Sequence, residues 1–122
     1  MVLVDKTYME EIKSWYDQRS ICFNYDVLPK FGLIVPGIAA GFMYITDDNR
    51  IALLEGFVTN PKAGMKAKDK AITDLTDMLV LIAQGKKVKH VFGLTDTKSI
   101  VNKSKTLGFK EVGNYTLIYQ EL

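Results

Sequence analysis

The chain has 122 residues, of which 48% are hydrophobic and 25% are charged, and its net charge is +2. These values are typical of one compact globular domain, here residues 1–122, and they exclude a disordered, collagen-like or low-complexity chain. The single cysteine, Cys22, cannot form an intrachain disulfide. Together with the single histidine, His90, it supplies too few ligands for a zinc site, so we expect no metal.

The charge is distributed unevenly along the chain. Residues 1–60 carry 5 basic and 8 acidic groups, whereas residues 61–122 carry 11 basic and 6 acidic groups. A basic half favours an anionic partner, such as nucleic acid, a membrane surface or a phosphorylated ligand. The N-terminus lacks the pattern of a secretory signal, and the longest apolar run elsewhere, Met78–Ala83, is far shorter than the ~18 residues of a membrane span. We therefore expect a cytoplasmic protein with no membrane partner.

The first predicted element is a helix. Apolar side chains recur every three or four positions over residues 7–19, which predicts an amphipathic helix. Thr7 and Glu10 fit a capping box at its start, and Asp5 is the alternative N-cap. Residues 20–30 fit either a short strand or a turn of helix, and both interpretations stay open.

Strand patterns follow from Phe31. Three runs, FGLIV, IAAGFMYI and IALLEGFV, are rich in β-branched and aromatic residues. Turn signals at Pro36-Gly37 and at TDDNR separate these runs. The pattern predicts a meander of three antiparallel strands.

The second half of the chain predicts a crossover. An apolar stripe over residues 71–82 indicates a long helix that ends at Gly85. The strand HVFGLT that follows completes a βαβ unit, so the third and fourth strands should be parallel neighbours. A shorter helix over residues 97–107 ends at Gly108, and the alternation in residues 109–122 predicts a last strand pair.

Two segments resemble one known family. They are VTNPKAGMKAKDKAI, residues 58–72, and TKSIVNKSKTLGF, residues 97–109. The first resembles the turn, basic loop and central-helix start of the GNAT family of N-acetyltransferases, and the second resembles its fourth helix, which ends in LGF. With the element order, the resemblance covers residues 30–122, although the family's second helix is shortened or missing. It implies an α/β (α+β) fold: a mostly antiparallel sheet of about six strands with a splayed parallel pair, flanked by about three helices.

The resemblance also implies a binding site for acetyl-CoA. In the family the cofactor lies where the two parallel strands splay apart, and its pyrophosphate lies at the start of the long helix. A helix N-terminus suits phosphate because it presents unpaired N–H groups and a partial positive charge. The pantetheine arm would pair with strand main-chain groups, much as an added strand does. The implied cofactor-binding residues are Phe57, Val58, Thr59, Gly64, Met65, Lys66, Ala67, Lys68, Asp69, Lys70 and Thr97.

The loop departs from the family pattern. Ala67 and Asp69 stand where relatives have the two glycines of Gly-x-Gly, and the Asp69 carboxylate would repel a pyrophosphate. Lys66, Lys68 and Lys70 could offset this repulsion. Two hypotheses stay open: a phosphate site that uses lysines in place of glycine amides, and a loop that holds no cofactor.

Two residues are candidates for catalysis. Glu55 interrupts the apolar run of the third strand, where the family often has a general base that deprotonates the substrate ammonium. The alternative is a polar-face residue of a half-buried strand. Ser104 stands where many relatives have a tyrosine that protonates the leaving thiolate. Serine is a poor acid, so another group or water performs that step, or no acyl transfer takes place.

The leading functional hypothesis is an N-acetyltransferase that transfers an acetyl group from acetyl-CoA to a primary amine by direct attack. No Cys or Ser nucleophile with a His partner is evident, which argues against a covalent intermediate. The acceptor amine is not identified. The alternative is a GNAT-like binding or regulatory module without acyl transfer, similar to small proteins encoded by bacteriophages.

The sequence also bears on two further kinds of partner. Nucleic acid is disfavoured, because no base-reading motif is present and arginine occurs only at Arg19 and Arg50. An exposed last strand could pair with that of a second copy in a homodimer.

Overall fold

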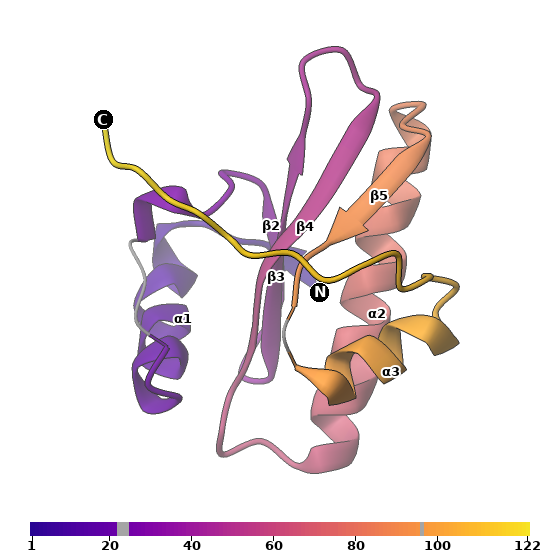
Figure 1. Cartoon of the computed structure of the whole chain (residues 1–122). Coiled ribbons are helices and arrows are strands. Elements are labelled where there is room, and N and C mark those ends of the chain that lie inside the picture. Colours follow the sequence, from indigo (N-terminus) through magenta and orange to yellow (C-terminus); the bar gives the residue numbers. More distant parts are fainter. Residues whose placement is uncertain (22–24, 96) are drawn as a thin grey trace.

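The computed structural model describes residues 1–21, 25–95 and 97–122. Figure 1 shows the elements in chain order. They are β1 (Val2–Leu3), α1 (Lys6–Gln18), a 3-10 turn η1 (Tyr25–Val27), β2 (Gly32–Val35), β3 (Ala39–Ile45), β4 (Ile51–Thr59), α2 (Met65–Gly85), β5 (His90–Gly93) and α3 (Lys98–Thr106). Between residues 20 and 30 the described part therefore holds a 3-10 turn, and residues 22–24, with Cys22, lie outside the described residues.

The five strands form one mixed sheet in the order β1-β2-β3-β4-β5. Every neighbouring pair is antiparallel except β4 and β5, which are parallel. The sequence-based prediction of a mostly antiparallel sheet with one parallel pair and three helices is confirmed.

The prediction of a last strand pair is wrong for the described residues. Residues 107–122 contain neither strand nor helix, and every residue from 110 to 122 is exposed. Alternation of apolar and polar residues indicates that a segment can form a strand, but it does not supply the neighbouring edge with which a strand must pair.

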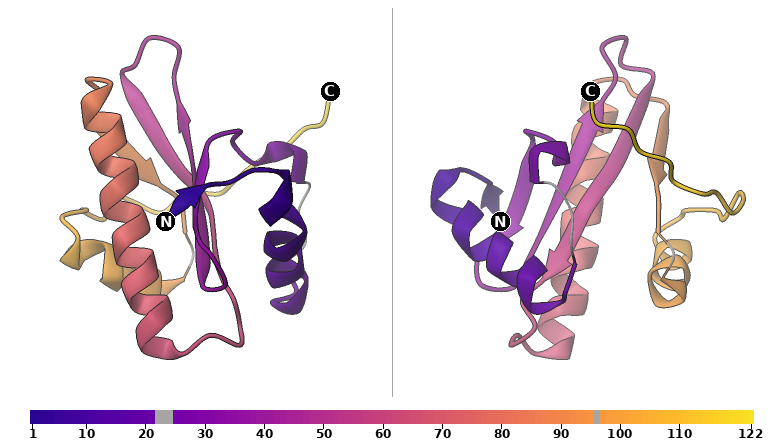
Figure 2. Two further views of the ribbon diagram at one scale, coloured as in Figure 1. Left: turned by 180° about the vertical axis from the view of Figure 1, so that it is seen from behind. Right: turned by 60° about the vertical axis from the view of Figure 1, so that its left-hand side comes forward.

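The sheet lies between α1 on one face and α2 on the other, as Figures 1 and 2 show. On the α1 face, Ile12, Trp15 and Tyr16 pack against side chains of β2, β3 and β4. On the α2 face, Leu75 and Leu79 are fully buried against the same three strands. These two apolar layers hold β4 in place, and the candidate site lies along β4.

The helix starts differ from the sequence prediction. The N-cap of α1 is Asp5, whose Oδ1 accepts a hydrogen bond from the Thr7 N–H at 2.9 Å, so the predicted capping box at Thr7 is not the observed cap. Helix α2 begins at Met65, directly after Gly64, so Lys66 to Lys70 lie in its first turns and the prediction of a loop there is wrong. The helix ends at Gly85 as predicted. Among the described residues, no helix combines the length and the apolar character needed to cross a lipid bilayer.

Two irregularities of β4 create the site. Its parallel pairing with β5 runs from Ile51 opposite His90 only as far as Leu54 opposite Gly93, although β4 continues to Thr59. Its antiparallel pairing with β3 shifts register at a bulge that contains Gly56. The second half of β4 therefore has a partner on one side only within the described part of the chain.

Candidate functional site

The open edge of β4 is the first component of the site. Val58 lies opposite Ala40 and the Asn60 N–H donates to the Ile38 carbonyl at 2.8 Å, so these residues direct their main-chain groups toward β3. Successive residues of a strand direct their N–H and C=O groups alternately to its two edges, so those of Phe57 and Thr59 point to the open edge. A strand-like ligand could form hydrogen bonds there.

Arg19 already contacts this edge. It is the C-cap of α1, and its Nε donates to the Thr59 carbonyl at 2.9 Å while its Nη2 donates to Thr59 Oγ1 at 2.5 Å. The sequence analysis did not assign Arg19 to the site. Forty residues separate the partners, and no local pattern indicates their contact.

The bulge places Glu55 and Gly56 beside α1. Gly56 has a φ of +68°, and a Cβ built there would lie 2.5 Å from Leu28 Cδ2 and 3.1 Å from Tyr16 Oη. The Tyr16 hydroxyl donates to the Gly56 carbonyl, and the Gly56 N–H donates to Glu55 Oε1 at 3.2 Å. The half-buried Glu55 carboxylate is thus folded back onto the bulge.

The surroundings of Tyr16 favour its protonated form. Burial is the main cause that raises the pKa of Tyr16 above its ordinary 10.0, and the Glu55 carboxylate and Tyr25 raise it further. Tyr16 therefore remains a hydrogen-bond donor at neutral pH. Its ring centre lies 6.0 Å from that of Tyr25, whose hydroxyl donates to Asp17 Oδ1 at 2.9 Å. These aromatic and acidic groups flank Glu55 on the α1 side.

The N-terminus of α2 is the second component. Gly64 is its N-cap, and the first helical hydrogen bond runs from the Lys68 N–H to the Gly64 carbonyl at 2.9 Å. The N–H groups of Met65, Lys66 and Ala67 precede that bond and so have no acceptor within the helix. No acidic residue lies in the first turn, and the end is well exposed. This arrangement favours an anion.

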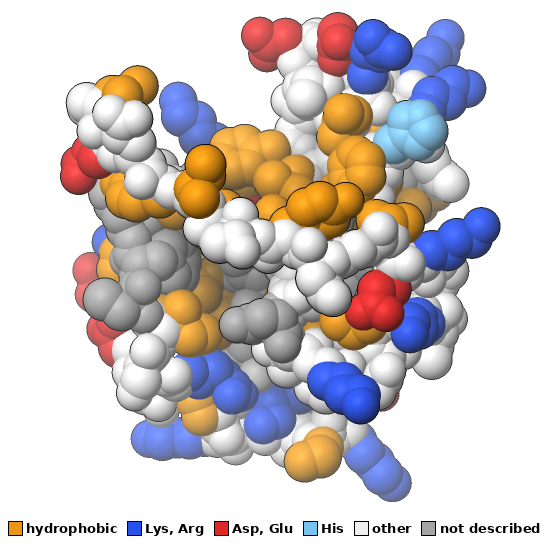
Figure 3. All heavy atoms as spheres, viewed as in Figure 1, with side chains coloured by type: hydrophobic (Ala, Val, Ile, Leu, Met, Phe, Trp, Pro, Cys, Tyr) orange, Lys and Arg blue, Asp and Glu red, His pale blue; other side chains and the backbone are white. Residues whose placement is uncertain are grey.

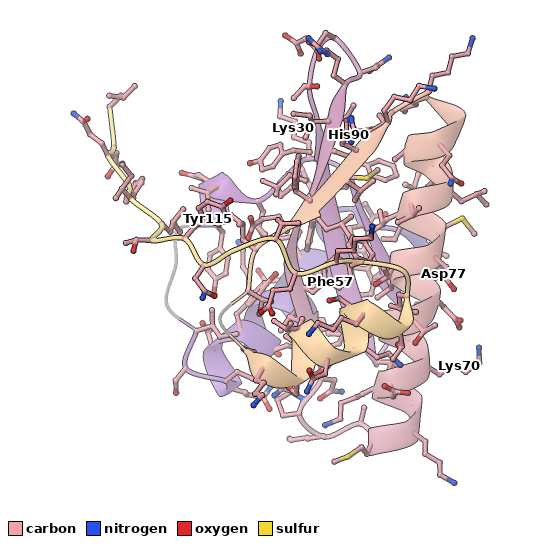
Figure 4. All side chains as sticks on the ribbon, turned by 45° about the vertical axis from the view of Figure 1, so that its right-hand side comes forward. Lys30, Phe57, Lys70, Asp77, His90 and Tyr115 are labelled. Carbon is pink, nitrogen blue, oxygen red and sulfur yellow. The ribbon has the colours of Figure 1, made fainter. Side chains whose placement is uncertain are left out.

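The charged side chains of α2 separate into two groups. Asp69 Oδ1 lies 2.8 Å from the Lys103 ammonium of α3. The carboxylate that was expected to repel a pyrophosphate is therefore ion-paired. Lys70 pairs with Asp74 at 2.6 Å along the helix and points away from α3 in Figure 4. Lys66 and Lys68 have no ion pair among the described residues. The sequence analysis missed Lys103, since nothing in sequence shows that α3 lies beside the start of α2.

Basic side chains gather at this end of the molecule. Figure 3 shows blue side chains along the lower part of the face, over the region of the α2 N-terminus and α3, and a band of apolar side chains above them.

The two site residues predicted in this region, Ser104 and Thr97, form hydrogen bonds with their own neighbours in the chain. The Ser104 hydroxyl donates to the Val101 carbonyl at 2.7 Å, within its own helix. Thr97 is the N-cap of α3, and its N–H donates to Thr95 Oγ1 at 3.1 Å. The Ser104 proton is therefore directed into α3.

Surface hollows lie elsewhere. Two open hollows, of about 420 and 530 Å³, both border Thr46 and Asp47 at the β3–β4 hairpin, far along β4 from Glu55 and the α2 N-terminus. The candidate site is defined instead by the hydrogen bonds around the β4 bulge and the α2 N-terminus. The described residues contain no group of three His, Cys, Asp or Glu side chains that could hold a metal ion.

Comparison with solved structures gives the fold relatives of this chain. The crystal structure of an acetyltransferase from Trypanosoma brucei superposes with a TM-score of 0.64 at 12% sequence identity, covering 97% of this chain and 96% of that one. A presumed acetyltransferase from Agrobacterium tumefaciens strain C58 has a TM-score of 0.47 at 19% identity, covering 74% and 67%. No family model and no curated protein matches the sequence. The first likeness shows that this chain has the fold of that acetyltransferase, in agreement with the fold that the sequence resemblance implied.

Proposed function

We propose that this chain is an acetyl-CoA-dependent N-acetyltransferase that transfers an acetyl group to a primary amine by direct attack. One observation carries the proposal. The open edge of β4, at Phe57 and Thr59, leads within a few residues to the N-terminus of α2, where the N-cap Gly64 offers no side chain to the free N–H groups. The pantetheine arm of CoA carries amides that can pair with a strand edge, and its pyrophosphate is an anion. The chain offers the two matching features in the same order.

In this proposal the main-chain groups of Phe57 bind the pantetheine arm. Thr59 contributes its N–H, since its carbonyl accepts from Arg19. Val58 directs its main chain toward β3 and its side chain into the core, so we assign it a packing role. The N–H groups that open α2, with Lys66 and Lys68, bind the phosphates, and Lys103 neutralises Asp69.

Glu55 is the proposed base. The amine must lose a proton before its nitrogen can attack the thioester carbon, and a half-buried carboxylate at the bulge can accept that proton directly or through water. The new C–N bond forms as the C–S bond breaks, and the thiolate leaves. The Ser104 hydroxyl donates to its own helix, so we propose that water, and not Ser104, protonates the leaving thiolate.

A second candidate function is a binding or regulatory module without acyl transfer. It is favoured by the Arg19 contact, which occupies the Thr59 carbonyl of the edge that CoA would use. A cytoplasmic location belongs to both proposals and is favoured by the single cysteine of the sequence.

Calorimetric titration with acetyl-CoA tests the site. We expect micromolar binding, and we expect Lys66→Glu to weaken it roughly tenfold, equivalent to ~1.4 kcal/mol, by placing a carboxylate beside the phosphates. Lys86→Glu is the matched control: it changes the net charge equally, but it lies at the other end of α2, about 30 Å away. It should leave the affinity within about twofold.

The other outcomes decide between the hypotheses. No binding up to millimolar acetyl-CoA would overturn the proposal. Equal losses in both variants would mean that only net charge matters and that the α2 N-terminus is not the phosphate site. Binding without acetylation of any amine in a panel of acceptors would favour the binding module.

A further inference from the structure

A row of apolar side chains crosses three strands of the sheet beside Glu55. Residues that pair in register on neighbouring strands point to the same face of a sheet. Tyr44 of β3 lies opposite Leu53 of β4, and Leu53 in turn lies opposite Phe92 of β5. Ile51 lies two residues before Leu53 on the same strand and so points to the same face. We call Tyr44, Ile51, Leu53 and Phe92 the apolar strip.

The apolar strip is open to solvent. The exposed fractions of its members on three strands are 43% for Tyr44, 38% for Ile51 and 45% for Phe92. By contrast, Phe42, two residues before Tyr44 on β3, is 2% exposed and packs in the cluster formed by α1. Helix α1 therefore covers this face near Phe42 and leaves the strip uncovered. Figure 3 shows apolar side chains gathered in the upper half of the visible face.

The apolar strip leads directly to the proposed base. Glu55 lies two residues beyond Leu53 on β4 and pairs with Phe42, so its side chain points to the same face one row along. Residues two apart on a strand are separated by about 7 Å, so Glu55 stands about 7 Å from the Leu53 row and about 13 Å from Ile51. An amine bound at Glu55 thus directs the rest of its molecule over the strip.

The two ends of the strip differ in charge. The Glu55 carboxylate at one end attracts an ammonium group. At the other end His90 lies opposite Ile51, and Figure 4 shows Lys30 at the same end of the sheet. The row between them is apolar apart from the Tyr44 hydroxyl, which already donates to the Val27 carbonyl. Among the described residues, the strip itself therefore offers no carboxylate to a second ammonium group.

We propose that the amine acceptor carries a single ammonium group on an apolar body, aromatic or branched alkyl, a few carbons from the nitrogen. The ammonium binds at Glu55, and the apolar body lies on Leu53 and Phe92, which determine specificity. The site is that of the proposed N-acetyltransferase, so this acceptor class rests on that function. A diamine or polyamine would lose hydration of its second ammonium over the apolar row without gaining a partner there.

The first experiment compares ethylamine, 2-phenylethylamine and 1,4-diaminobutane as acceptors at saturating acetyl-CoA, with release of the CoA thiol as the measured rate. We expect kcat/KM for 2-phenylethylamine to exceed that for ethylamine by roughly tenfold, because the ring leaves water when it lies on the strip. The rate with 1,4-diaminobutane should stay within about twofold of that with ethylamine, since its second ammonium finds no partner.

The second experiment changes Phe92. Phe92→Asp removes the ring and adds a carboxylate to the row, so kcat/KM should fall roughly tenfold for 2-phenylethylamine and rise several-fold for 1,4-diaminobutane. Phe92→Ser removes the ring without adding charge, so it should show the fall without the rise. Ethylamine is too short to reach the strip, and its rate should stay within about twofold in both variants.

The control for charge and exposure lies on the other face of the sheet. Leu81 of α2 is 59% exposed, and Leu81→Asp should leave the rates with all three amines unchanged. Phe92 is 45% exposed in the folded chain, so its substitution should preserve the fold. Thermal unfolding of each variant checks this, and Phe92→Ser provides the test if Phe92→Asp does not fold.

The remaining outcomes overturn the acceptor class. A rate with 1,4-diaminobutane above that with 2-phenylethylamine would show that the site selects a second positive charge. Equal effects of Phe92→Asp and Leu81→Asp would mean that the strip does not contact the acceptor. If ethylamine or the diamine reacts and 2-phenylethylamine does not, the acceptor class is wrong and the proposed acetyltransferase function stands. If no amine reacts and acetyl-CoA does not bind, both proposals fail.

Discussion

At the scale of single residues, the hydroxyl of Tyr16 connects α1 with the bulge of β4. The side chain is 1% exposed and donates to the Gly56 carbonyl. Glu55 contacts the same residue, because its Oε1 accepts a hydrogen bond from the Gly56 N–H. The position of the proposed base therefore depends on a contact between two elements that are far apart in sequence.

Removing that hydroxyl should destabilise the protein. Tyr16→Phe leaves the Gly56 carbonyl without this donor inside the structure, and we expect a loss of about 1–3 kcal/mol in the free energy of unfolding. Urea denaturation measures it. Tyr8→Phe is the control, because the half-buried Tyr8 hydroxyl has no hydrogen bond to another described residue, and its effect should stay below about 0.5 kcal/mol.

The same variant should alter the dependence of stability on alkaline pH. The pKa of Tyr16 is raised in the folded state, so above the ordinary value of 10.0 the unfolded chain releases a proton that the folded chain retains. The stabilisation is present below pH 10.0 and is lost as pH rises, by up to ~1.4 kcal/mol per pH unit. Tyr16→Phe should show a smaller loss between pH 10 and 11.5 than the unaltered chain. Equal slopes would contradict the buried, protonated state of Tyr16.

Substitution of Glu55 tests its role in catalysis. Glu55→Gln keeps the shape of the side chain but removes the base, so with an amine acceptor found by screening we expect turnover to fall by roughly 10²–10⁴ while acetyl-CoA affinity is kept. The acid side of the pH–rate profile should flatten. Glu10→Gln, at an exposed position of α1, serves as the control. Unchanged kinetics for Glu55→Gln would remove this residue from the mechanism.

At the scale of elements, the bulge of β4 is the feature that sets the site. A side chain at Gly56 would need the left-handed conformation and would press on Leu28 and Tyr16. Gly37 also has a positive φ, but nothing lies within 4 Å of a Cβ there. Gly37→Ala should cost about 1–2 kcal/mol for the backbone conformation alone, and Gly56→Ala about 1–3 kcal/mol more for the crowding. Thermal unfolding compares them, and equal losses would mean that the bulge accommodates the methyl group.

Elements with a buried face were predictable from the sequence. The three-to-four spacing of Ile12, Trp15 and Tyr16 identified α1. The runs rich in β-branched and aromatic residues, separated by turn signals, identified β2, β3 and β4. The last strand pair was not predictable, because periodicity describes one segment, while strand formation needs a second one. The N-cap at Asp5 was only the alternative prediction, since Thr7 with Glu10 offered the better capping-box signal in the sequence.

At the scale of the whole molecule, the contacts that define the site join distant parts of the chain. Tyr16 reaches Gly56, Arg19 reaches Thr59, and Lys103 reaches Asp69. The sequence predicted Glu55 and the α2 loop as candidates, because they lie on recognisable elements. It could not predict the partners, because hydrogen bonds and ion pairs across the fold leave no periodic trace in either segment.

The hydrogen bond from Arg19 to the Thr59 carbonyl couples the end of α1 to ligand binding at β4. A ligand amide that took the Thr59 carbonyl would displace Arg19 Nε, so α1 and the ligand compete for one acceptor. Competition of this kind is reciprocal: the ligand loosens the C-terminal turn of α1 by the same free energy by which Arg19 weakens the ligand. A ligand that leaves this carbonyl to Arg19 and uses only the Thr59 N–H avoids the competition, so α1 selects for that mode of binding.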